Sequence, residues 1–418
     1  MKVFLQKAMF ILIFAVAAFF GMNLGQKPVK AAGKWYRGKY VTVRRDGCDF
    51  RAYLSDDGKE SWIFQIIITK DKLKKLTFPK EVENAPVTRV GYGDELYEDD
   101  SDCIYSIFET VLEPWHNAYR TDEKAESITS IEFPETLTRI DTGAFCGLKK
   151  LKKLDIPDGV EELSGYAFAA CSELTEVKLP AGLKKFGVSA FEKCKAIKKL
   201  SVPSDSTMLR TKKGYLLTKD SKKLVWAPPA RKKISIPAGV AELGFASLIA
   251  SQAKEITIPK SVSKIEGGAL AGEKIEKVVL KKGNKVYHLH GGCIYKKVDK
   301  SLTAILVKKR RARVSSKVKV LGDGISVMGV RVKKINRVDI PKSVKSVTGE
   351  WEFFNGFSCS ALVYFHGKTP PKVIGKNTHI PSFNKIYVPK KAKKSYIRWA
   401  KDHVINVKRW SKDYLHTF

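Results

Sequence analysis

The stretch IPDGVEELSGYAFAACSELTEVKLP, residues 156–180, contains two prolines, Pro157 and Pro180, whose positions differ by 23. Four consecutive segments share this spacing: ITSIEFP, LKKLDIP, LTEVKLP and IKKLSVP, which end at Pro134, Pro157, Pro180 and Pro203. Self-similarity at such a period is the sequence signature of solenoid proteins. The sequence therefore predicts a coil with a 23-residue period from Ile128 onward.

A second block of the repeat lies between the prolines. Phe145, Phe168 and Phe191 recur at the same 23-residue interval, and each follows an alanine. The apolar residues before each proline alternate as in a short strand with one buried face, and the proline ends that strand because it lacks an N–H. A second apolar pair, as in GVEEL (159–163), indicates another brief strand. Since one coil cannot bury its apolar edge alone, we expect the phenylalanines to fill an interior that neighbouring coils share.

Two cysteines follow the same register. Cys171 and Cys194 occupy one repeat position, where the preceding coil has Leu148. A position that accepts Cys or Leu is predicted to be an interior packing site, at which free Cys behaves as a small hydrophobe. A redox pair or a metal site is the alternative. Cys146 is out of register, and we expect it to lie nearer the surface.

Two copies of the repeat are interrupted, at residues 205–228 and 284–307. Each interruption contains a glycine, an apolar strand, a turn centred on aspartate and a further strand. Glycine and aspartate supply tight turns, so both segments are predicted to form β-hairpin insertions.

Residues 1–31 have the features of a secretory signal peptide: a basic start, an apolar run at 8–25 and small residues before a cut at Ala32. An uncleaved anchor is the alternative, since the run approaches the length that spans a bilayer. No later stretch is apolar enough to do so. We therefore expect the mature chain to be secreted or held at the cell surface, and not to span the membrane.

The net charge of +34 is unevenly distributed. Residues 51–200 carry a net charge of −5, and residues 201–418 carry +32. This asymmetry predicts either an acidic partner for the C-terminal half or a solubility function. The outward positions of the strands before each proline, such as Glu176 and Lys178, carry both signs. The basic excess is therefore predicted to lie on turns, edges and second strands.

The basic segment KKRRAR (308–313) is the candidate binding site. An exported protein meets anionic polymers outside the cell rather than nucleic acid, so we expect no nucleic-acid partner. A solvated basic turn explains the segment equally well. The residues proposed for binding are Lys308, Lys309, Arg310, Arg311 and Arg313.

Other chemistry is weakly indicated. His288, His290 and Cys293 could ligate a metal, but no fourth ligand is evident. The acidic stretch ELYEDDSD (95–102) does not have the spacing of a calcium loop. No phosphate-binding loop, nucleophile elbow or zinc-protease motif occurs. We therefore expect no catalytic residue, no bound metal and no cofactor.

The strand that ends in Ile-Pro, the Ala-Phe-x-x-Cys-x-x-Leu block and the 23-residue period resemble the BspA-like leucine-rich repeat family of bacterial secreted and surface proteins. LKKLTFPKEVENAPVTRVG (73–91) resembles the family's first repeat, and KIYVPKKAKKSYIRWAKD (385–402) resembles its ending. The resemblance covers roughly residues 60–402. It implies a mainly β, right-handed leucine-rich-repeat solenoid with two short strands per coil and short helical turns. It also implies a binding or adhesion role.

The predicted organisation has four parts, and no catalysis is expected of any. The leading hypothesis is a secreted or cell-surface module that binds protein or glycan, and the alternative is a basic structural protein retained on an anionic wall polymer. The parts are a signal peptide (1–31), an N-terminal cap and degenerate first repeat with an acidic insertion (32–127), the solenoid with its hairpins (128–350), and a C-terminal repeat and cap with a terminal helix (351–418).

Overall fold

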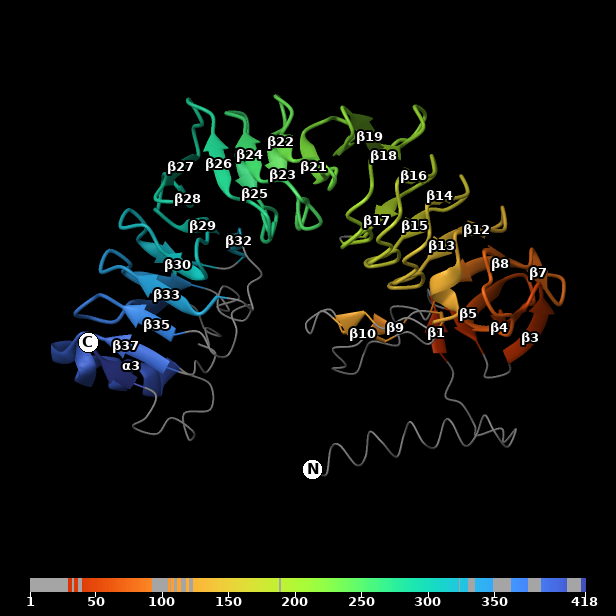
Figure 1. The fold of residues 1–418 in the computed structure, drawn as a ribbon, viewed down its shortest axis with the longest axis horizontal. Helices are drawn as coiled ribbons and strands as arrows, with labels where there is room; N and C mark the ends of the chain where they lie inside the picture. The colour runs from red at the N-terminus through yellow and green to blue at the C-terminus, as the bar shows by residue number, and fades with distance from the viewer. Residues whose placement is uncertain are drawn as a thin grey trace.

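The structure is a computed structural model of the whole chain, in which the chain coils into an open arch (Figure 1). The residues that it describes are 29–31, 34–36, 40–91, 104–105, 107–108, 111–113, 118–119, 123–187, 189–322, 324–329, 335–348, 362–374, 385–403 and 415–418. Residues 1–28 of the predicted signal peptide and the acidic stretch 95–102 lie outside this set.

The arch is built from short parallel strands in two rows, which we call the first and second ladders. The first ladder runs along the outer rim of the arch in Figure 1. Its strands pair as β6–β12, β14–β16–β18, β22–β24–β26 and β30–β33–β35–β37–β38. They are β6 (Lys75–Thr77), β12 (Ser130–Glu132), β14 (Lys153–Asp155), β16 (Glu176–Lys178), β18 (Lys199–Ser201), β22 (Lys233–Ser235), β24 (Glu255–Ile258), β26 (Lys277–Leu280), β30 (Arg311–Arg313), β33 (Arg337–Ile340), β35 (Leu362–Phe365), β37 (Lys385–Val388) and β38 (Leu415–Thr417).

The second ladder follows the inner side of the arch (Figure 1). In each coil, its strand comes one turn of the chain after the first-ladder strand. Its parallel runs are β8–β13–β15–β17, β21–β23–β25 and β31–β34–β36. The strands are β8 (Ala85–Val90), β13 (Arg139–Ile140), β15 (Glu162–Leu163), β17 (Lys185–Phe186), β21 (Lys223–Trp226), β23 (Glu242–Leu243), β25 (Lys264–Ile265), β31 (Val320–Leu321), β34 (Ser346–Thr348) and β36 (Lys372–Ile374). The expected mainly β solenoid with a 23-residue spacing is thus confirmed.

Antiparallel strands cover the N-terminal end, and a helix lies beside the C-terminal strands. At the N-terminal end, β3, β4 and β5 form a meander, and β5 joins the second ladder through β8. The remaining elements there are β1 (Val29–Ala31), β2 (Lys34–Tyr36), β3 (Tyr40–Arg45), β4 (Cys48–Leu54), β5 (Ser61–Ile68), β7 (Glu81–Val82), β9 (Ile104–Tyr105), β10 (Val111–Glu113), β11 (Ala118–Tyr119) and the 3-10 turn η2 (Ala125–Ser127). The C-terminal end has η4 (Lys390–Ala392) and α3 (Lys393–His403).

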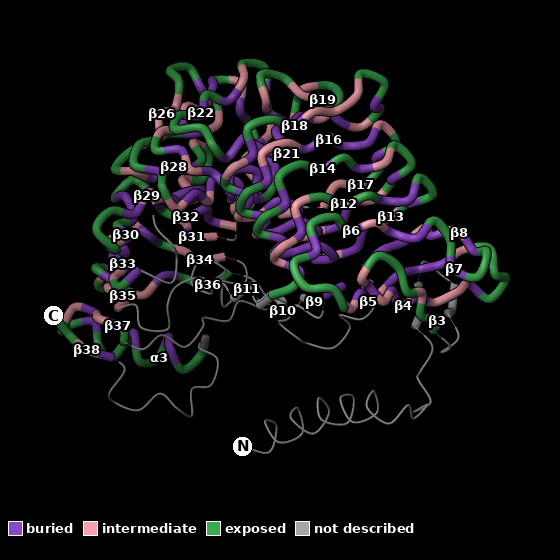
Figure 2. Tube along the Cα trace, turned by 45° about the vertical axis from the view of Figure 1, so that its right-hand side comes forward, coloured by how far each residue is buried: buried purple, intermediate pink, exposed green. Residues whose placement is uncertain are grey.

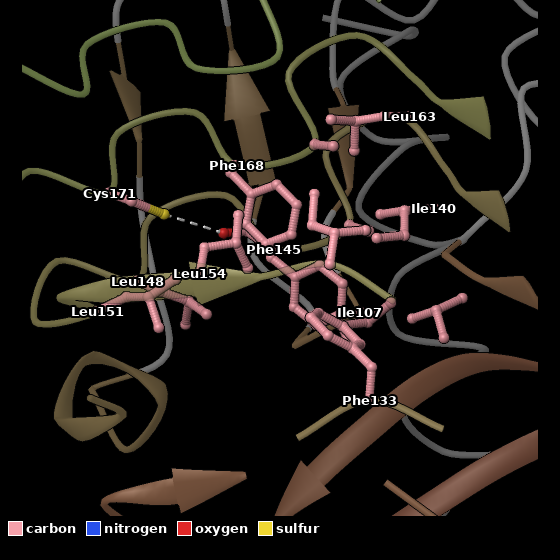
Figure 3. Packing of buried hydrophobic residues seen from close by; sticks show 14 of the residues in the cluster. Ile107, Phe133, Ile140, Phe145, Leu148, Leu151, Leu154, Leu163, Phe168 and Cys171 are labelled. Atoms are coloured by element: carbon pink, nitrogen blue, oxygen red, sulfur yellow. Dashed lines mark hydrogen bonds between the residues drawn. The ribbon is translucent and has the colours of Figure 1, made fainter. Parts of the chain in front are cut away.

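A phenylalanine stack forms the centre of the first coils. The Phe145 and Phe168 rings lie 5.1 Å apart and nearly parallel, and Phe191 continues the stack 6.0 Å beyond Phe168. Figure 3 shows the first two rings surrounded by aliphatic side chains, with the Cys171 thiol directed at the Phe145 carbonyl, 3.4 Å away. Cys194 makes the equivalent hydrogen bond to Phe168 at 3.0 Å. Each coil therefore contributes one ring and one small side chain to a shared interior.

The expectation for Cys146 was wrong. Its side chain is fully buried, in a small cluster with Ala169 and the partly buried Tyr166. The Ala-Phe turn of one coil rests on the same turn of the next, because the Gly147 N–H donates to the Ala169 carbonyl at 2.8 Å. A side chain that points away from the phenylalanine stack is therefore still covered by its neighbour.

Two antiparallel hairpins interrupt the coils. The strands β19 (Leu209–Lys212) and β20 (Tyr215–Thr218) lead into β21, and β27 (Tyr287–His290) and β28 (Cys293–Lys296) lead into β29 (Leu302–Leu306). β29 then pairs in parallel with β32 (Ser326–Met328).

Each hairpin lies at the boundary between two hydrophobic cores. Among the described residues, no strand of 123–203 pairs with a strand of 209–290. The side chain of Leu216 packs into the core of the earlier coils, whereas that of Leu217 packs into the next core. At the second hairpin, Ile294 faces the middle core and Cys293 the last one. Alternate residues of one strand thus join two successive blocks.

The exposure of the residues follows the arrangement of the two ladders. Figure 2 shows buried positions concentrated along the ladders and exposed ones at the turns between them. Among the described residues, no helix is both long enough and apolar enough to cross a bilayer.

Candidate functional site

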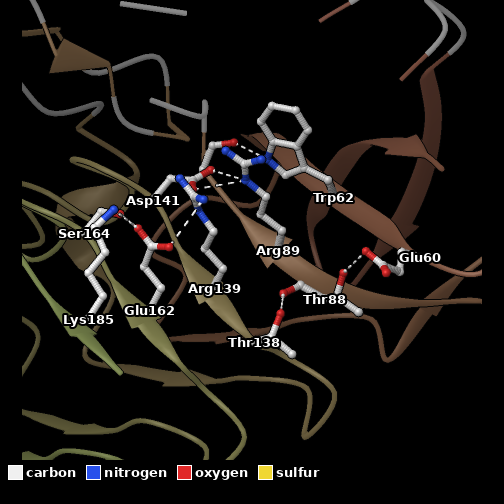
Figure 4. Close-up of polar contacts among 11 residues, drawn as sticks. Glu60, Trp62, Thr88, Arg89, Thr138, Arg139, Asp141, Glu162, Ser164 and Lys185 are labelled. Carbon is white, nitrogen blue, oxygen red and sulfur yellow. Dashed lines mark hydrogen bonds and ion pairs between the residues drawn. The ribbon is translucent and has the colours of Figure 1, made fainter. Parts of the chain in front are cut away.

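A network of buried charges joins β5 and β8 to the end of β13 (Figure 4). The Asp141 carboxylate receives hydrogen bonds from Arg89 at 2.8 Å and Arg139 at 2.7 Å. The Arg89 guanidinium also lies 4.1 Å from the centre of the Trp62 ring. Burial raises the pKa of Asp141, and the two guanidinium groups oppose that shift. Because these charges satisfy one another, the network is structural and offers no free group to a ligand.

The predicted basic segment forms a tight turn followed by a strand. Lys308, Lys309 and Arg310 are exposed, and the Arg311 N–H donates to the Lys308 carbonyl at 3.0 Å. Lys309 and Arg310 have positive φ angles of 49° and 60°. The turn therefore holds three cationic side chains at the edge of the first ladder.

Arg311 has a different role from the other members of that segment. It forms an ion pair with Asp339 on the adjacent strand β33. Asp339 also pairs with Arg337 at 2.8 Å, and His366 Nε2 lies 3.1 Å from the same carboxylate. Burial works to raise the pKa of Asp339, but hydrogen bonds from Arg311, Arg337 and His366 hold it well below its usual value. The charge of Arg311 is thus engaged within the fold, while Arg313 remains exposed.

An aromatic row follows on the same outward face of the first ladder. Arg337 lies over the Tyr364 ring at 3.6 Å, and the Tyr364 and Tyr387 rings stack 4.4 Å apart. His416 extends the stack, with its ring centre 5.0 Å from that of Tyr387. Sequence reasoning missed this row, although LVYF and KIYV place tyrosine at an outward strand position. The ring faces cover each other, so they are not platforms for a stacked ligand.

A second basic surface lies on the turns that connect the first ladder to the second in three successive coils. The turns run from β30 to β31, from β33 to β34 and from β35 to β36. Together with the first residue of β36, these turns contribute two exposed lysines per coil, and we call the set the lysine corner: Lys317, Lys319, Lys342, Lys345, Lys368 and Lys372.

Backbone hydrogen bonds hold the lysine corner together. The Lys345 N–H donates to the Lys319 carbonyl, and the Lys372 N–H donates to the Lys345 carbonyl, both at 2.8 Å. Among the described residues, no carboxylate forms an ion pair with any of the six lysines. Like charges therefore lie on adjacent coils, and no carboxylate of the described part of the chain pairs with them.

The same corner is charge-paired in the earlier coils. There, Lys184 pairs with Glu161 at 2.7 Å, and Lys185 pairs with Glu162 at 2.6 Å. Each pair joins one coil to the next at the 23-residue spacing. The difference between the two corners is thus in charge and not in backbone arrangement.

The histidine-containing hairpin does not gather ligands. His288 and His290 are exposed, whereas Cys293 is buried and accepts the Ser315 N–H at 3.3 Å. His290 Nδ1 lies 2.9 Å from the Ser315 hydroxyl. In the part of the chain that the structure describes, no group of three or more His, Cys, Asp or Glu side chains could hold a metal ion.

An open hollow of about 520 Å³ lies beside the turn between β20 and β21, along β21, β23 and β25. Lys223 pairs with Glu242 at 2.8 Å and with Glu266 at 3.0 Å, and Lys264 reaches both carboxylates. Burial works to raise the pKa of Glu266, but hydrogen bonds with Glu242 and the two lysines lower it to about 2. Lys223 and Lys264 are thus paired with carboxylates, unlike the lysines of the lysine corner.

Comparisons with known proteins agree with the repeat pattern. The family described as the BspA type leucine rich repeat region matches in six copies, over residues 122–213 and 230–298. No curated protein matches the sequence.

Solved structures give weaker similarity. A leucine rich cell surface protein from Faecalibacterium prausnitzii is 16% identical over 81% of this chain and 96% of its own, with a TM-score of 0.35. The pneumococcal vaccine antigen PcpA is 15% identical over 90% of this chain and 98% of its own, with a TM-score of 0.36. Residues 122–213 and 230–298 are thus a BspA-type leucine-rich repeat region, and the chain folds as a leucine-rich repeat solenoid.

Proposed function

We propose that this protein is a non-catalytic binding module, secreted or held at the cell surface, that presents its solenoid to a protein or glycan. The supporting observation is the division of each strand between core and surface. Leu154 and Val338 both face the interior, while residues beside them on the same strands, the exposed Lys153 and the half-buried Arg337, are open to the surface. Repeat proteins use such extended surfaces for binding, because the outer positions vary without disturbing the core.

The test is a pull-down of the mature chain against envelope fractions and host matrix, repeated across a range of salt concentrations. Retention that survives high salt supports a shaped protein or glycan site, since screening weakens exposed charge contacts. Failure of every fraction to retain the chain, even at low salt, contradicts the proposal.

A second candidate is a basic structural protein held on an anionic wall polymer by charge. It is favoured by the net charge of +32 on residues 201–418. In this case moderate salt releases the chain from its support, because the attraction is screened over about 8–10 Å at physiological ionic strength.

The basic turn has its own test within this proposal. Replacing Lys308, Lys309 and Arg313 with glutamine removes exposed charge and leaves the Arg311–Asp339 ion pair in place. Charge-driven retention should weaken in this variant. If retention is unchanged, the turn is not part of the contact.

A further inference from the structure

We propose that the lysine corner is the seat of a linear, phosphate-bearing polyanion that lies across the coils, parallel to the axis of the solenoid. This inference deepens the proposed binding function and depends on it. It names a different surface from the basic turn at 308–310, and it assigns a chemical class to the ligand.

The positive charges of the lysine corner have no carboxylate partner among the described residues. Like charges that lie opposite each other on neighbouring strands destabilise a sheet. The first coils avoid this cost at the same corner, where Glu161 and Glu162 face Lys184 and Lys185. In the later coils, Lys319 and Lys345 occupy adjacent rungs, and no described carboxylate pairs with either. Stability of the fold does not explain this arrangement, whereas a ligand that brings negative charge does.

The backbone that carries the lysines is fixed by strand pairing on both sides. The turn residues before and after each lysine are held by two ladders, since β30–β33–β35 pair on one side and β31–β34–β36 on the other. Val318 and Val344 anchor their turns in the core at 0% and 6% exposure. Adjacent strands are spaced by about 4.8 Å. Lys319 and Lys345 therefore lie at one register position of adjacent coils, and Lys372 lies one position further along, opposite Ser346, so a polymer with recurring anionic groups can follow the lysines from coil to coil.

The types of side chain at and near the lysine corner indicate the chemistry of the ligand. The row is made of lysines, which bind phosphate as point charges, rather than of arginines, which favour planar, bidentate partners. Proteins that bind single-stranded nucleic acid add aromatic faces on which bases stack. The nearest aromatic row offers none between its members, because Tyr364 and Tyr387 cover each other at 4.4 Å. A phosphate polymer without bases fits these features better than nucleic acid does.

The experiment measures binding of the full mature chain to linear polyphosphate of defined length, across a series of salt concentrations. The test variant is K319Q/K345Q/K372Q, and the matched control is K195Q/K198Q/K199Q, which removes the same charge from three exposed lysines of the first coils. We expect the test variant to bind at least tenfold more weakly than the control. The slope of log K against log salt should fall by about two, since each neutralised charge of a flexible strand contributes about 0.7.

Equal weakening of the test variant and the control overturns the proposal, because the chain then binds by overall charge. A single-stranded oligonucleotide of equal charge that binds tenfold tighter than polyphosphate also overturns it, because bases are then recognised.

The pull-down separates this inference from the proposed function. If the unmodified chain is retained by envelope fractions and the test variant is retained like the control, only the lysine corner is refuted. If no fraction retains the unmodified chain, the proposed function fails, whatever the polyphosphate result.

Discussion

The coils at residues 128–203 and those at residues 311–388 have the same two ladders but place charge differently. In the earlier coils, lysine and glutamate alternate from one coil to the next at the corner, as in the Glu162–Lys185 pair at 2.6 Å. In the later coils, lysine follows lysine. The comparison teaches that the interior specifies the coil, while the corner is free to carry either compensated or uncompensated charge.

The interiors also differ in kind. The earlier block is filled by the parallel stack of Phe145, Phe168 and Phe191, whereas the later block packs Val338, Val363 and other aliphatic residues beside Phe365 and Tyr396. Both solutions bury the inward residue of first-ladder strands, as Leu154 does in β14 and Val338 in β33. The substitutions below test whether the first block depends on its stack as strongly as the geometry indicates.

The largest effect is expected from Phe168→Ala. The ring is fully buried and contacts a ring on each side, so its removal leaves a cavity that two coils share. We expect the free energy of unfolding to fall by about 3–5 kcal/mol, as for other buried Phe→Ala changes. Denaturant unfolding followed by circular dichroism measures this loss. Phe245→Ala is the control, because that side chain is 52% exposed. A similar loss in both variants would show that the stack contributes nothing specific.

A smaller effect is expected from Asp339→Asn in the later block. Loss of the carboxylate leaves Arg311 and Arg337 without their partner, and we expect a cost of about 1–3 kcal/mol. Since the folded pKa of Asp339 lies below its usual value of about 3.9, its contribution is complete above that pH and declines as the pH falls below it.

The pH dependence provides the check. Thermal unfolding between pH 7 and pH 2.5 should show a steeper loss of stability on the acid side for the unmodified chain than for Asp339→Asn. Parallel curves would mean that the carboxylate does not titrate with folding.

The smallest effect concerns one backbone position of the regular coils. Gly147 and Ala170 occupy equivalent positions of successive coils and have φ angles of 80° and 60°. Ala170→Gly should stabilise the chain by about 0.5–1 kcal/mol, because only glycine adopts this conformation without steric cost. Gly147→Ala should destabilise it by a similar amount. Both are measurable as shifts of the thermal midpoint, and shifts of the same sign would argue against equivalent coils.

Particular residues show what the sequence could predict. Pro157 and Phe168 recur at a fixed interval because every coil presents them to the same neighbours, so the period, the short strands and the solenoid could be predicted. Cys146 was misplaced, because its burial depends on how one turn rests on the next coil and not on its own alternation.

The lysine corner could not be predicted for a related reason. The intervals between Lys319, Lys345 and Lys372 depart from the regular period, and Ser315 stands where the earlier coils have proline, so the repeat offers no register there. The charge totals indicated a basic half, and the mixed first-ladder positions directed attention to turns and edges. Which turns meet in space, and which lysines lack a carboxylate partner, depends on the stacking of the coils.

The measurement that tests the central claim most directly is lysine-acetylation footprinting of the full mature chain by mass spectrometry, with and without polyphosphate. The account predicts protection of Lys319, Lys345 and Lys372, with no change at Lys184 and Lys185, whose ammonium groups are already paired. Protection spread evenly over both corners, or confined to Lys308 and Lys309, would contradict it.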